Sequence, residues 1–334
     1  MSARVVLAVD GGNSKTDLAL VRGDGEVLSL VRGPLSSPHH LGLGGSLAVL
    51  RDLLEQAAGD ADLDPTGGPV ADVAQLQMAG VDFPSEEREL REAVEERRWA
   101  RRTNVGNDTF AVLRAGSERG WGVAVVCGSG INCVGVAPDG REARFPALGA
   151  ITGDWGGGYD LGLEALSAAA RSEDGRGPST SLEQAVPTCF GFARPSELAE
   201  AIHRREIPLR RVTELAPAVF GEAERDDVAA RILDRLAEEV VALARVALER
   251  LKLTREPVDV LLGGGVLQAA DGRVIDAIAN GLREVAPASR VRQTTAPPIV
   301  GAALLGLDEL GASAENQERV RMELVARVQD AEDD

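Results

Sequence analysis

Residues 4–22 read RVVLAVDGGNSKTDLALVR. The valine-rich run at 4–10 predicts a buried strand, which ends in the polar glycine loop at 10–16. Alternating apolar and polar residues then predict a second strand at 17–22, and a third strand at 26–31 follows a glycine turn. The chain therefore opens with a three-stranded meander whose first turn has the size of a phosphate group.

The same pattern returns further along the chain. A strand is predicted at 121–126, and the loop at 127–132 leads into a further strand at 133–137. A turn and a third strand that runs into Phe145 complete the repeat. Helical patterns such as 45–58 follow, so the sequence predicts two mixed α/β domains that face each other.

Length and composition agree with this division. The chain has 334 residues, which suits two domains of roughly 150 residues each. Hydrophobic residues make up 44% and charged residues 27%, as in a soluble globular protein. The formal charge of −17 disfavours nucleic acid and anionic membranes as partners. No apolar run approaches the length of a membrane span and no signal-peptide pattern precedes the first strand, so a cytoplasmic protein is expected.

Three cysteines, Cys127, Cys133 and Cys189, form no CxxC pair. An odd number without that spacing indicates neither a disulfide framework nor a zinc site. All three are therefore expected to be small buried hydrophobic residues.

The loop after the first strand is the first candidate binding site. Its glycines let several backbone N–H groups converge on an anion, and phosphate is the expected guest. Asp10 at the strand end is expected to hold Mg²⁺, often through water. Such loops also occur as plain hairpins, but a second copy at 128–130 strengthens the interpretation. The predicted phosphate-binding residues are Gly11, Gly12, Asn13, Ser14, Lys15, Thr16, Gly128 and Ser129.

Asp108 stands at a predicted junction between a strand at 102–105 and a helix at 109–115. Two interpretations stay open there. As an N-cap, its carboxylate would accept backbone N–H bonds at the start of the helix. As a general base, it would take the proton from a sugar hydroxyl that attacks the γ-phosphate of ATP.

Two further glycine clusters follow. Residues 153–159 read GDWGGGY, and Asp154 within them is expected either to cap the next helix or to bind sugar hydroxyls or a hydrated metal. Three glycines follow a predicted strand at 258–262, and their bare backbone suits the flat surface of an adenine. The expected adenosine site is Gly263, Gly264 and Gly265.

Four helical patterns outside these motifs complete the prediction. Residues 85–98 predict a charged surface helix, and 226–253 carry apolar stripes that predict a long helix packed on the second sheet. A helix of small residues is predicted at 299–307 and a last helix at 314–328.

The order of these motifs resembles that of the BadF/BadG/BcrA/BcrD ATPase family, especially its N-acetylglucosamine kinase-like members, within the actin, sugar-kinase and Hsp70 superfamily. Residues 10–17 resemble its first phosphate motif, Asn107-Asp108 its first connecting motif and 128–130 its second phosphate motif. Residues 263–265 resemble its adenosine motif, and Gly301-Ala302-Ala303 its second connecting helix. Together these motifs cover nearly the whole chain.

The resemblance implies two ribonuclease H-like, actin-like ATPase domains with ATP and Mg²⁺ in the cleft between them. It places the domains at 1–116 and 117–308, with a C-terminal helix at 309–330 completing the first and the adenosine site in the second. It also implies Asp108 as the catalytic base. The implied substrate-binding residues are Gly80, Asn107, Asp108, Ser129, Gly130, Asn132 and Asp154.

The expected activity is therefore ATP-dependent phosphorylation of an amino sugar, first of all N-acetylglucosamine at its 6-hydroxyl, by a protein expected to form a homodimer. Glucosamine or another hexosamine is the alternative substrate, because Trp155 and Gly157 depart from the Gly-Asp-Glu-Gly-Ser motif usual in the family. Trp155 is expected either to stack on a sugar ring or to fill the core.

Two other classes of protein are less favoured. An ATP-driven activase of a redox enzyme needs cysteines around a shared iron–sulfur cluster, and the positions of the three cysteines do not suit one. A sugar-sensing repressor needs a DNA-binding helix-turn-helix, usually ahead of the first strand, and that strand begins within a few residues of Met1.

Overall fold

The computed structural model describes residues 4–65 and 67–333. These residues belong to two compact units, one from Met1–Trp121 together with Thr294–Asp334 and the other from Gly122–Gln293. The first unit is therefore discontinuous in sequence, and the second is inserted between its two parts.

The first unit is built on a mixed five-stranded sheet with the order β3-β2-β1-β4-β5. Its central strand, β1, pairs antiparallel with β2 and parallel with β4. The valine-rich residues of β1 are buried along almost the whole strand. This is expected for a strand in the middle of a sheet that helices cover on both faces. The strands are β1 (Val5–Gly11), β2 (Lys15–Arg22), β3 (Val27–Pro34), β4 (Ala71–Met78) and β5 (Ala100–Asn107).

The second unit repeats this arrangement. Its five-stranded sheet has the order β10-β9-β6-β7-β8, in which β6 takes the place of β1 and pairs antiparallel with β7 and parallel with β9. The predicted repeat and the α/β fold class are therefore confirmed, although the short polar strand β10 was not predicted. The strands are β6 (Gly122–Cys127), β7 (Ile131–Val136), β8 (Glu142–Arg144), β9 (Asp259–Gly263) and β10 (Arg290–Gln293).

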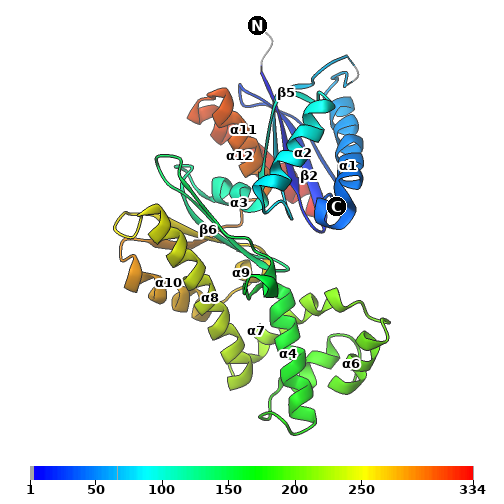
Figure 1. Ribbon diagram of the computed structural model, residues 1–334, viewed down its shortest axis with the longest axis vertical. Coiled ribbons are helices and arrows are strands. Elements are labelled where there is room, and N and C mark those ends of the chain that lie inside the picture. Colours follow the sequence, from blue (N-terminus) through cyan, green and yellow to red (C-terminus); the bar gives the residue numbers. More distant parts are fainter. Residues whose placement is uncertain (1–3, 66, 334) are drawn as a thin grey trace. The chain divides into compact units, whose positions relative to one another are not determined.

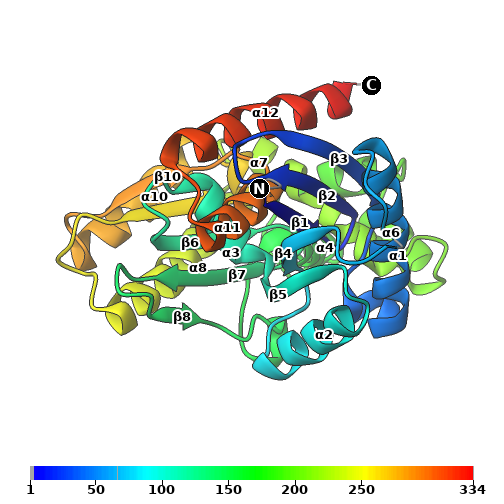
Figure 2. The same ribbon diagram turned by 90° about the horizontal axis from the view of Figure 1, so that it is seen from above.

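Helices cover both faces of the first sheet (Figure 1, Figure 2). On one face α1 and α2 pack through a leucine-rich cluster that includes Leu50, Leu54 and Leu90. On the other face α3, α11 and α12 pack through a second cluster of valine, alanine and leucine. The helices of this unit are α1 (Pro38–Asp60), α2 (Pro84–Glu96), α3 (Asp108–Gly116), α11 (Pro298–Leu310) and α12 (Ala314–Asp333).

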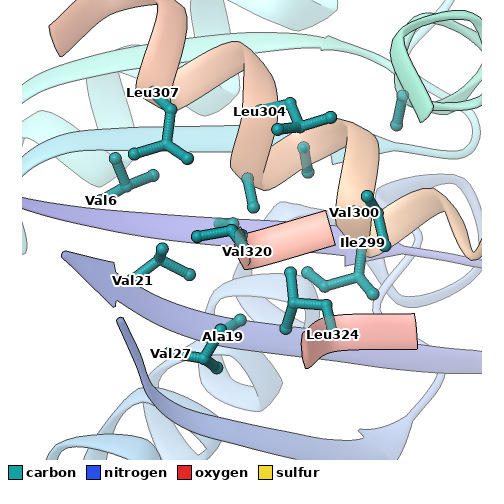
Figure 3. Packing of buried hydrophobic residues seen from close by; sticks show 14 of the residues in the cluster. Val6, Ala19, Val21, Val27, Ile299, Val300, Leu304, Leu307, Val320 and Leu324 are labelled. Carbon is teal, nitrogen blue, oxygen red and sulfur yellow. The ribbon is translucent and has the colours of Figure 1, made fainter. Parts of the chain in front are cut away.

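The helix α11 contributes most of the apolar side chains of α3, α11 and α12 to this second cluster. Figure 3 shows Leu307 of α11, Val320 of α12 and Val6 of β1 gathered in one cluster. The helix lies close to α3 because Gly301 has no side chain: a Cβ there would stand 1.8 Å from the carbonyl oxygen of Ala111. The last part of the chain is thus packed tightly on the first.

This packing differs from the predicted division into domains. The division implied by the resemblance assigns residues up to 308, and so nearly all of α11, to the second domain. In the structure α11 contacts α3, β1 and β4, and the first unit includes the chain from residue 294 onward. The buried apolar surface of α11 therefore determines its unit, whatever its place in the chain.

Two long helices, α4 (Gly157–Glu173) and α8 (Asp227–Leu251), dominate the second unit (Figure 1). The carboxylate of Asp226 caps α8, accepting the N–H bonds of Val228 at 2.7 Å and Ala229 at 3.1 Å. The helix packs on β6 and β7, as predicted. The remaining helices are η1 (Gly149–Ile151), α5 (Leu182–Thr188), α6 (Pro195–His203), η2 (Leu209–Leu215), α7 (Ala216–Glu222), α9 (Gly265–Gln268) and α10 (Gly272–Val285).

None of the helices in the described ranges is long and apolar enough to cross a membrane.

Cys127 and Cys133 are buried in the second sheet, where burial raises the pKa of both thiols. The expectation of burial is wrong for Cys189, which is exposed, because it follows the short helix α5 after that helix has buried Leu182 and Val186.

Replacing Gly301 with alanine tests the contact between α11 and α3. Alanine favours a helix over glycine by about 1 kcal/mol, but a Cβ here overlaps the Ala111 carbonyl group, and overpacking costs about 1–3 kcal/mol. We therefore expect Gly301→Ala to unfold at a lower temperature than the wild type in differential scanning calorimetry.

The matched control is Gly221→Ala. Gly221 also lies inside a helix, α7, and a Cβ there meets nothing within 4 Å. This variant should unfold at the wild-type temperature or slightly above it. A Gly301→Ala protein as stable as Gly221→Ala would contradict the close contact.

Candidate functional site

Three strand ends of the first unit meet at one edge of its sheet. In the parallel register Asp10 of β1 lies beside Gln77 of β4, and Met78 of β4 lies beside Asn107 of β5. Parallel strands place their carboxyl ends, and the loops that follow, on the same side of a sheet. The loops that follow these three strands are therefore brought together within this unit.

The loop after β1 is a tight turn. The Gly12 N–H donates to the carbonyl oxygen of Lys15 at 2.9 Å. At Gly11 a Cβ would lie 2.4 Å from the sulfur of Met78, so a larger residue does not fit without displacing that side chain. The tip at 13–15, with asparagine, serine and lysine, is exposed. An anion can therefore reach these three residues from solvent.

Thr16, at the base of this loop, has a structural role. Its side chain is fully buried, and its hydroxyl donates to the carbonyl oxygen of Pro34 at 2.7 Å and lies 2.7 Å from Ser36 Oγ. The hydroxyl that was predicted to reach a phosphate is thus engaged inside the unit. The exposed groups of the loop are those of its tip.

Asp17 and Asp10 face different charge environments on neighbouring strands. Asp17 is buried and pairs with Arg32 in two hydrogen bonds, Nε to Oδ1 at 2.7 Å and Nη2 to Oδ2 at 3.0 Å. The pKa of Asp10 is raised well above its ordinary value, first by burial and then by the charges of Asp108 and Asp17, against the opposing effect of Lys15. An ionised Asp10 therefore lies where added positive charge is favourable.

Asn107 caps α3. Its Oδ1 accepts the Thr109 N–H at 2.9 Å, and its Nδ2 donates to Asp82 Oδ1 at 2.8 Å. The capping role that was one interpretation of Asp108 is therefore filled by its neighbour, and Asp108 is the first residue of the helix. The side chain of Asn107, which the resemblance assigns to substrate binding, thus connects the loop after β4 to the start of α3.

Gly80 lies in that loop with φ of 73°. A Cβ at this position would stand 2.8 Å from His39 Cβ and 2.9 Å from Ser37 Oγ. The Ser37 hydroxyl donates to the carbonyl oxygen of Ala79 at 2.9 Å. The loop is thus fixed from two sides, by Ser37 and by the cap of α3.

Burial raises the pKa values of two further carboxyl groups toward neutral pH. It raises the pKa of Asp108 to about 6, against a hydrogen bond from the Thr109 N–H. Burial, together with the charges of Asp108 and Glu86, raises the pKa of Asp82 to about 7. Because the charge of Asp108 also raises the pKa of Asp10, the three carboxylates are coupled, and ionising all of them together is unfavourable.

A hydrated Mg²⁺ ion fits this donor set. Asp10 carries oxygen ligands of the kind that Mg²⁺ prefers, and a divalent cation would offset its repulsion by Asp108 and Asp17. Gln77 Oε1 is buried without a hydrogen-bond partner among the described residues, so it can accept a bond from metal-bound water. In the same residues no three His, Cys, Asp or Glu side chains gather to hold a metal.

In the second unit the turn after β6 contacts the start of α4. The Gly128 N–H donates to the carbonyl oxygen of Gly130 at 3.0 Å. The carbonyl oxygens of Gly128 and Ser129 accept the N–H bonds of Gly158 at 2.8 Å and Tyr159 at 2.9 Å. The predicted second phosphate loop and the glycine cluster at 153–159 are thus joined by backbone hydrogen bonds.

Two contacts here require glycine. Gly157 has φ of 76°, and a Cβ would lie 2.4 Å from the carbonyl oxygen of Gly130. Gly264 has φ of 81°, and a Cβ would lie 2.4 Å from the carbonyl oxygen of Cys127. Because β9 pairs with β6, the loop at 263–265 also lies against the turn after β6. All three predicted glycine loops of this unit are therefore neighbours.

Asn132 and Asp154 lie beside these loops. Asn132 is half-buried on β7, and its Oδ1 accepts the N–H bond of Cys133 at 2.7 Å. Asp154 is half-buried and accepts a hydrogen bond from the Thr152 hydroxyl. The N-cap of α4 is Gly156, so the capping interpretation of Asp154 does not apply.

Trp155 does not fill the core of this unit. It is half-buried, and the guanidinium carbon of Arg235 lies 4.0 Å from the centre of its ring. This is the geometry of a cation–π contact. No sequence pattern indicated it, because the two residues lie far apart in the chain.

A sequence model of one ATPase family matches residues 7–306, from β1 into α11. The chain belongs to the BadF/BadG/BcrA/BcrD ATPase family. The resemblance drawn from its motifs is thereby confirmed. The match spans both units, so it includes every glycine loop described above.

Three similar proteins carry related names. The N-acetyl-D-glucosamine kinase of Dictyostelium discoideum is 26% identical over 320 residues, covering 92% of this chain and 99% of the relative. The N-acetylmuramic acid/N-acetylglucosamine kinase of Clostridium acetobutylicum is 28% identical over 268 residues, covering 79% and 86%. A crystal structure described as an N-acetylglucosamine kinase of Chromobacterium violaceum has a TM-score of 0.72 at 26% identity, covering 92% and 100%. These relatives support the predicted enzyme class, an ATP-dependent sugar kinase.

Replacing Asp82 with asparagine tests the coupled carboxylates. Because its pKa is raised from 3.8 to about 7, the folded protein binds this proton more tightly than the unfolded chain, and its stability falls as pH rises through that range. Asparagine removes the charge and keeps an oxygen that can accept the Asn107 amide bond. By thermal unfolding, Asp82→Asn should be more stable than wild type at about pH 8 and similar at about pH 4.

Asp139→Asn is the control for this substitution. Asp139 is exposed, and Arg141 holds its pKa below the ordinary value, so loss of its charge should bring no gain at about pH 8. If Asp82→Asn were less stable than wild type at both pH values, the unfavourable ionisation of Asp82 would be refuted.

Replacing Gly157 with alanine tests the contact between the two glycine loops. A left-handed backbone costs an alanine about 1–2 kcal/mol, and the overlap with the Gly130 carbonyl group adds about 1–3 kcal/mol. Gly175→Ala is the matched control, because Gly175 has φ of 77° and a Cβ there meets nothing within 4 Å. Gly157→Ala should therefore lower the thermal midpoint more than Gly175→Ala, and equal losses would argue against the contact.

Proposed function

We propose that the protein is an ATP-dependent kinase that phosphorylates N-acetylglucosamine at its 6-hydroxyl, with Asp108 as the general base. The observation that carries the proposal is the state of Asp108. Asn107 is the N-cap of α3, and burial raises the pKa of Asp108 to about 6 in spite of the hydrogen bonds that it accepts from Thr109. A base with a pKa just below neutral is ionised at physiological pH and still binds a proton well.

In the proposed step Asp108 accepts the proton of the 6-hydroxyl as the sugar oxygen forms its bond to the γ-phosphorus. The bond between that phosphorus and the oxygen bridging to the β-phosphate breaks, and ADP leaves. Phosphoryl transfer depends mainly on positioning and charge stabilisation, so a fixed base at the head of α3 suits it.

The other charged groups of the first unit complete this proposal. Asp10 would hold Mg²⁺, which when bound offsets the charge of the phosphates. Lys15 is exposed at the tip of the first glycine loop, where its ammonium group can reach phosphate oxygens. The chain has only two lysines, Lys15 and Lys252, and uses arginine for nearly all its other cations. Lysine binds phosphate as a compact point charge, as in other phosphate-binding loops.

The second unit would supply the remaining contacts. Its turn at 128–130 would bind phosphate and its three glycines at 263–265 the adenosine, since both present backbone without side chains. Ser129, Gly130, Asn132 and Asp154 would bind sugar hydroxyls. The carboxylate of Asp154 and the amide of Asn132 are half-buried and offer the polar groups that this requires.

The choice of sugar rests on the relatives. All three named above are described as N-acetylglucosamine kinases, and one is also named for N-acetylmuramic acid. Glucosamine and other hexosamines remain the alternative substrates, because Trp155 and Gly157 alter the glycine cluster next to Asp154.

Replacing Asp108 with asparagine tests the function and the base together. ADP release is measured with ATP, Mg²⁺ and, in turn, N-acetylglucosamine, N-acetylmuramic acid, glucosamine and glucose. We expect sugar-dependent release that is highest with N-acetylglucosamine. Asp108→Asn should lower kcat by about 10²–10⁴ and change KM far less, because the lost proton transfer acts in the transition state.

The control is Asp139→Asn, an exposed aspartate that should leave kcat unchanged. The wild-type kcat/KM should also fall as pH drops through about 6, where Asp108 becomes protonated. ADP release that needs no sugar would reject the kinase. A kinase that keeps its kcat in Asp108→Asn would reject the base alone.

A further inference from the structure

A cavity of about 220 Å³, open to solvent, lies in the second unit along α4 and α8. These two helices contact each other (Figure 1). The residues that line the cavity recur three and four positions apart on each helix, so each helix contributes one face. The volume is far above the roughly 10–15 Å³ that one water molecule needs. The positions that line it are 164, 167, 168 and 171 of α4 and 228, 231, 232 and 235 of α8, together with Pro178.

Three arginines line this cavity, Arg171, Arg231 and Arg235. Glu164 is the acidic residue among the lining side chains, and Ser167 adds a hydroxyl. The lining thus has an excess of positive charge, although the chain as a whole has a formal charge of −17. Against that background such a cavity concentrates small anions. We call it the arginine cavity.

Arg231 makes no hydrogen bond or ion pair within the part of the chain that the structure describes. Elsewhere on the same helix an arginine commonly has a carboxylate partner one turn away. For example, Nη1 of Arg245 lies 3.9 Å from Oε1 of Glu249. The guanidinium group of Arg231 is therefore available to a ligand at the centre of the α8 face.

The two flanking arginines are oriented by neighbours and keep spare donors. Arg171 Nη2 donates to the carbonyl oxygen of Arg176 at 2.9 Å. Arg235 lies over the ring of Trp155, with Glu239 Oε1 at 4.0 Å from its Nε. A guanidinium group has five N–H donors, so each can still bind an acceptor. Both side chains are thus held in place and remain able to bind a ligand.

We propose that the arginine cavity binds a phosphomonoester. The planar donor fork of arginine matches phosphate oxygens, and the three terminal oxygens of one phosphate group can serve three arginines. A carboxylate has only two oxygens to share among them. Glu164 would repel a second phosphate group and can accept a bond from a hydroxyl. A sugar phosphate therefore fits better than a diphosphate.

Arg235 connects the arginine cavity to the glycine cluster at 153–159. Its guanidinium group contacts Trp155, the residue after Asp154. An anion that binds to Arg235 therefore changes the electrostatic surroundings of the Trp155 ring. Binding to the cavity stands independently of the proposed kinase reaction, whereas an effect of binding on the sugar contact of Asp154 rests on that function.

Tryptophan fluorescence tests the binding. The full chain is titrated at low salt with inorganic phosphate and, separately, with glucose 6-phosphate. A saturable change is expected with both, and Trp155→Phe should remove it. Arg231→Gln should raise Kd by roughly tenfold or more, because it removes a charge-assisted bond. A lower Kd for glucose 6-phosphate identifies a sugar phosphate as the ligand, and equal values identify phosphate itself; both results support the site.

Two controls locate the site. Arg245→Gln removes a charge from α8 outside the cavity and should leave Kd unchanged, and so should Lys15→Gln in the first glycine loop. Arg171→Gln repeats the test from the opposite helix if Arg231→Gln folds poorly. The proposal is overturned if neither ligand saturates, or if Arg231→Gln binds like Arg245→Gln. Because binding needs no turnover, an active kinase without binding would overturn this proposal alone.

Discussion

The hydrogen bond from the Thr109 N–H to Asn107 Oδ1 fixes the start of α3 and with it the position of Asp108. A helix start needs an acceptor for its free N–H groups, and an aspartate that provides one is stabilised as the anion. Asp226 at the head of α8 shows the result: despite burial, the hydrogen bonds it accepts from Ser181, Thr180 and Ala229 lower its pKa to about 2. Asp108 also accepts hydrogen bonds from Thr109, but burial outweighs them and raises its pKa to about 6.

Close backbone contact is the second constraint on the site. Gly157 and Gly264 place chain segments where a Cβ would overlap a carbonyl oxygen, so the loops of the second unit support one another. In the first unit the same purpose is served by side chains, with Thr16 and Ser37 fixing the loops beside Asp10. Both kinds of contact fix the backbone of the loops and leave the tips of the loops exposed to solvent. A loop of this kind can present N–H groups to a ligand with little loss of conformational freedom.

The sequence predicts those parts of the molecule that depend on local patterns. Valine-rich runs and glycine turns indicated the opening three strands of each sheet, and their repetition indicated the two-unit fold, whereas β4 and β10 were not predicted. The cap of α3 was not predicted correctly, because Asn107 and Asp108 are both good caps and only the folded backbone distinguishes them. Gln77 was not singled out either, although a polar side chain inside an apolar strand was a signal that could have drawn attention to it. The sequence also did not predict that α11 belongs to the first unit or that Trp155 contacts Arg235. Both depend on contacts between distant segments, which no local pattern encodes.

The insertion of the second unit within the first has a consequence for synthesis on the ribosome. Residues up to Trp121 emerge early, but α11 and α12, which together with α3 cover one face of their sheet, belong to the segment after Thr294. At about 5–20 residues per second, the roughly 170 residues between them take about 10–35 seconds to translate. During that time the uninterrupted second unit can fold, while Val6, Val21 and their neighbours lack their cover. The part of the chain that is made first is therefore completed last.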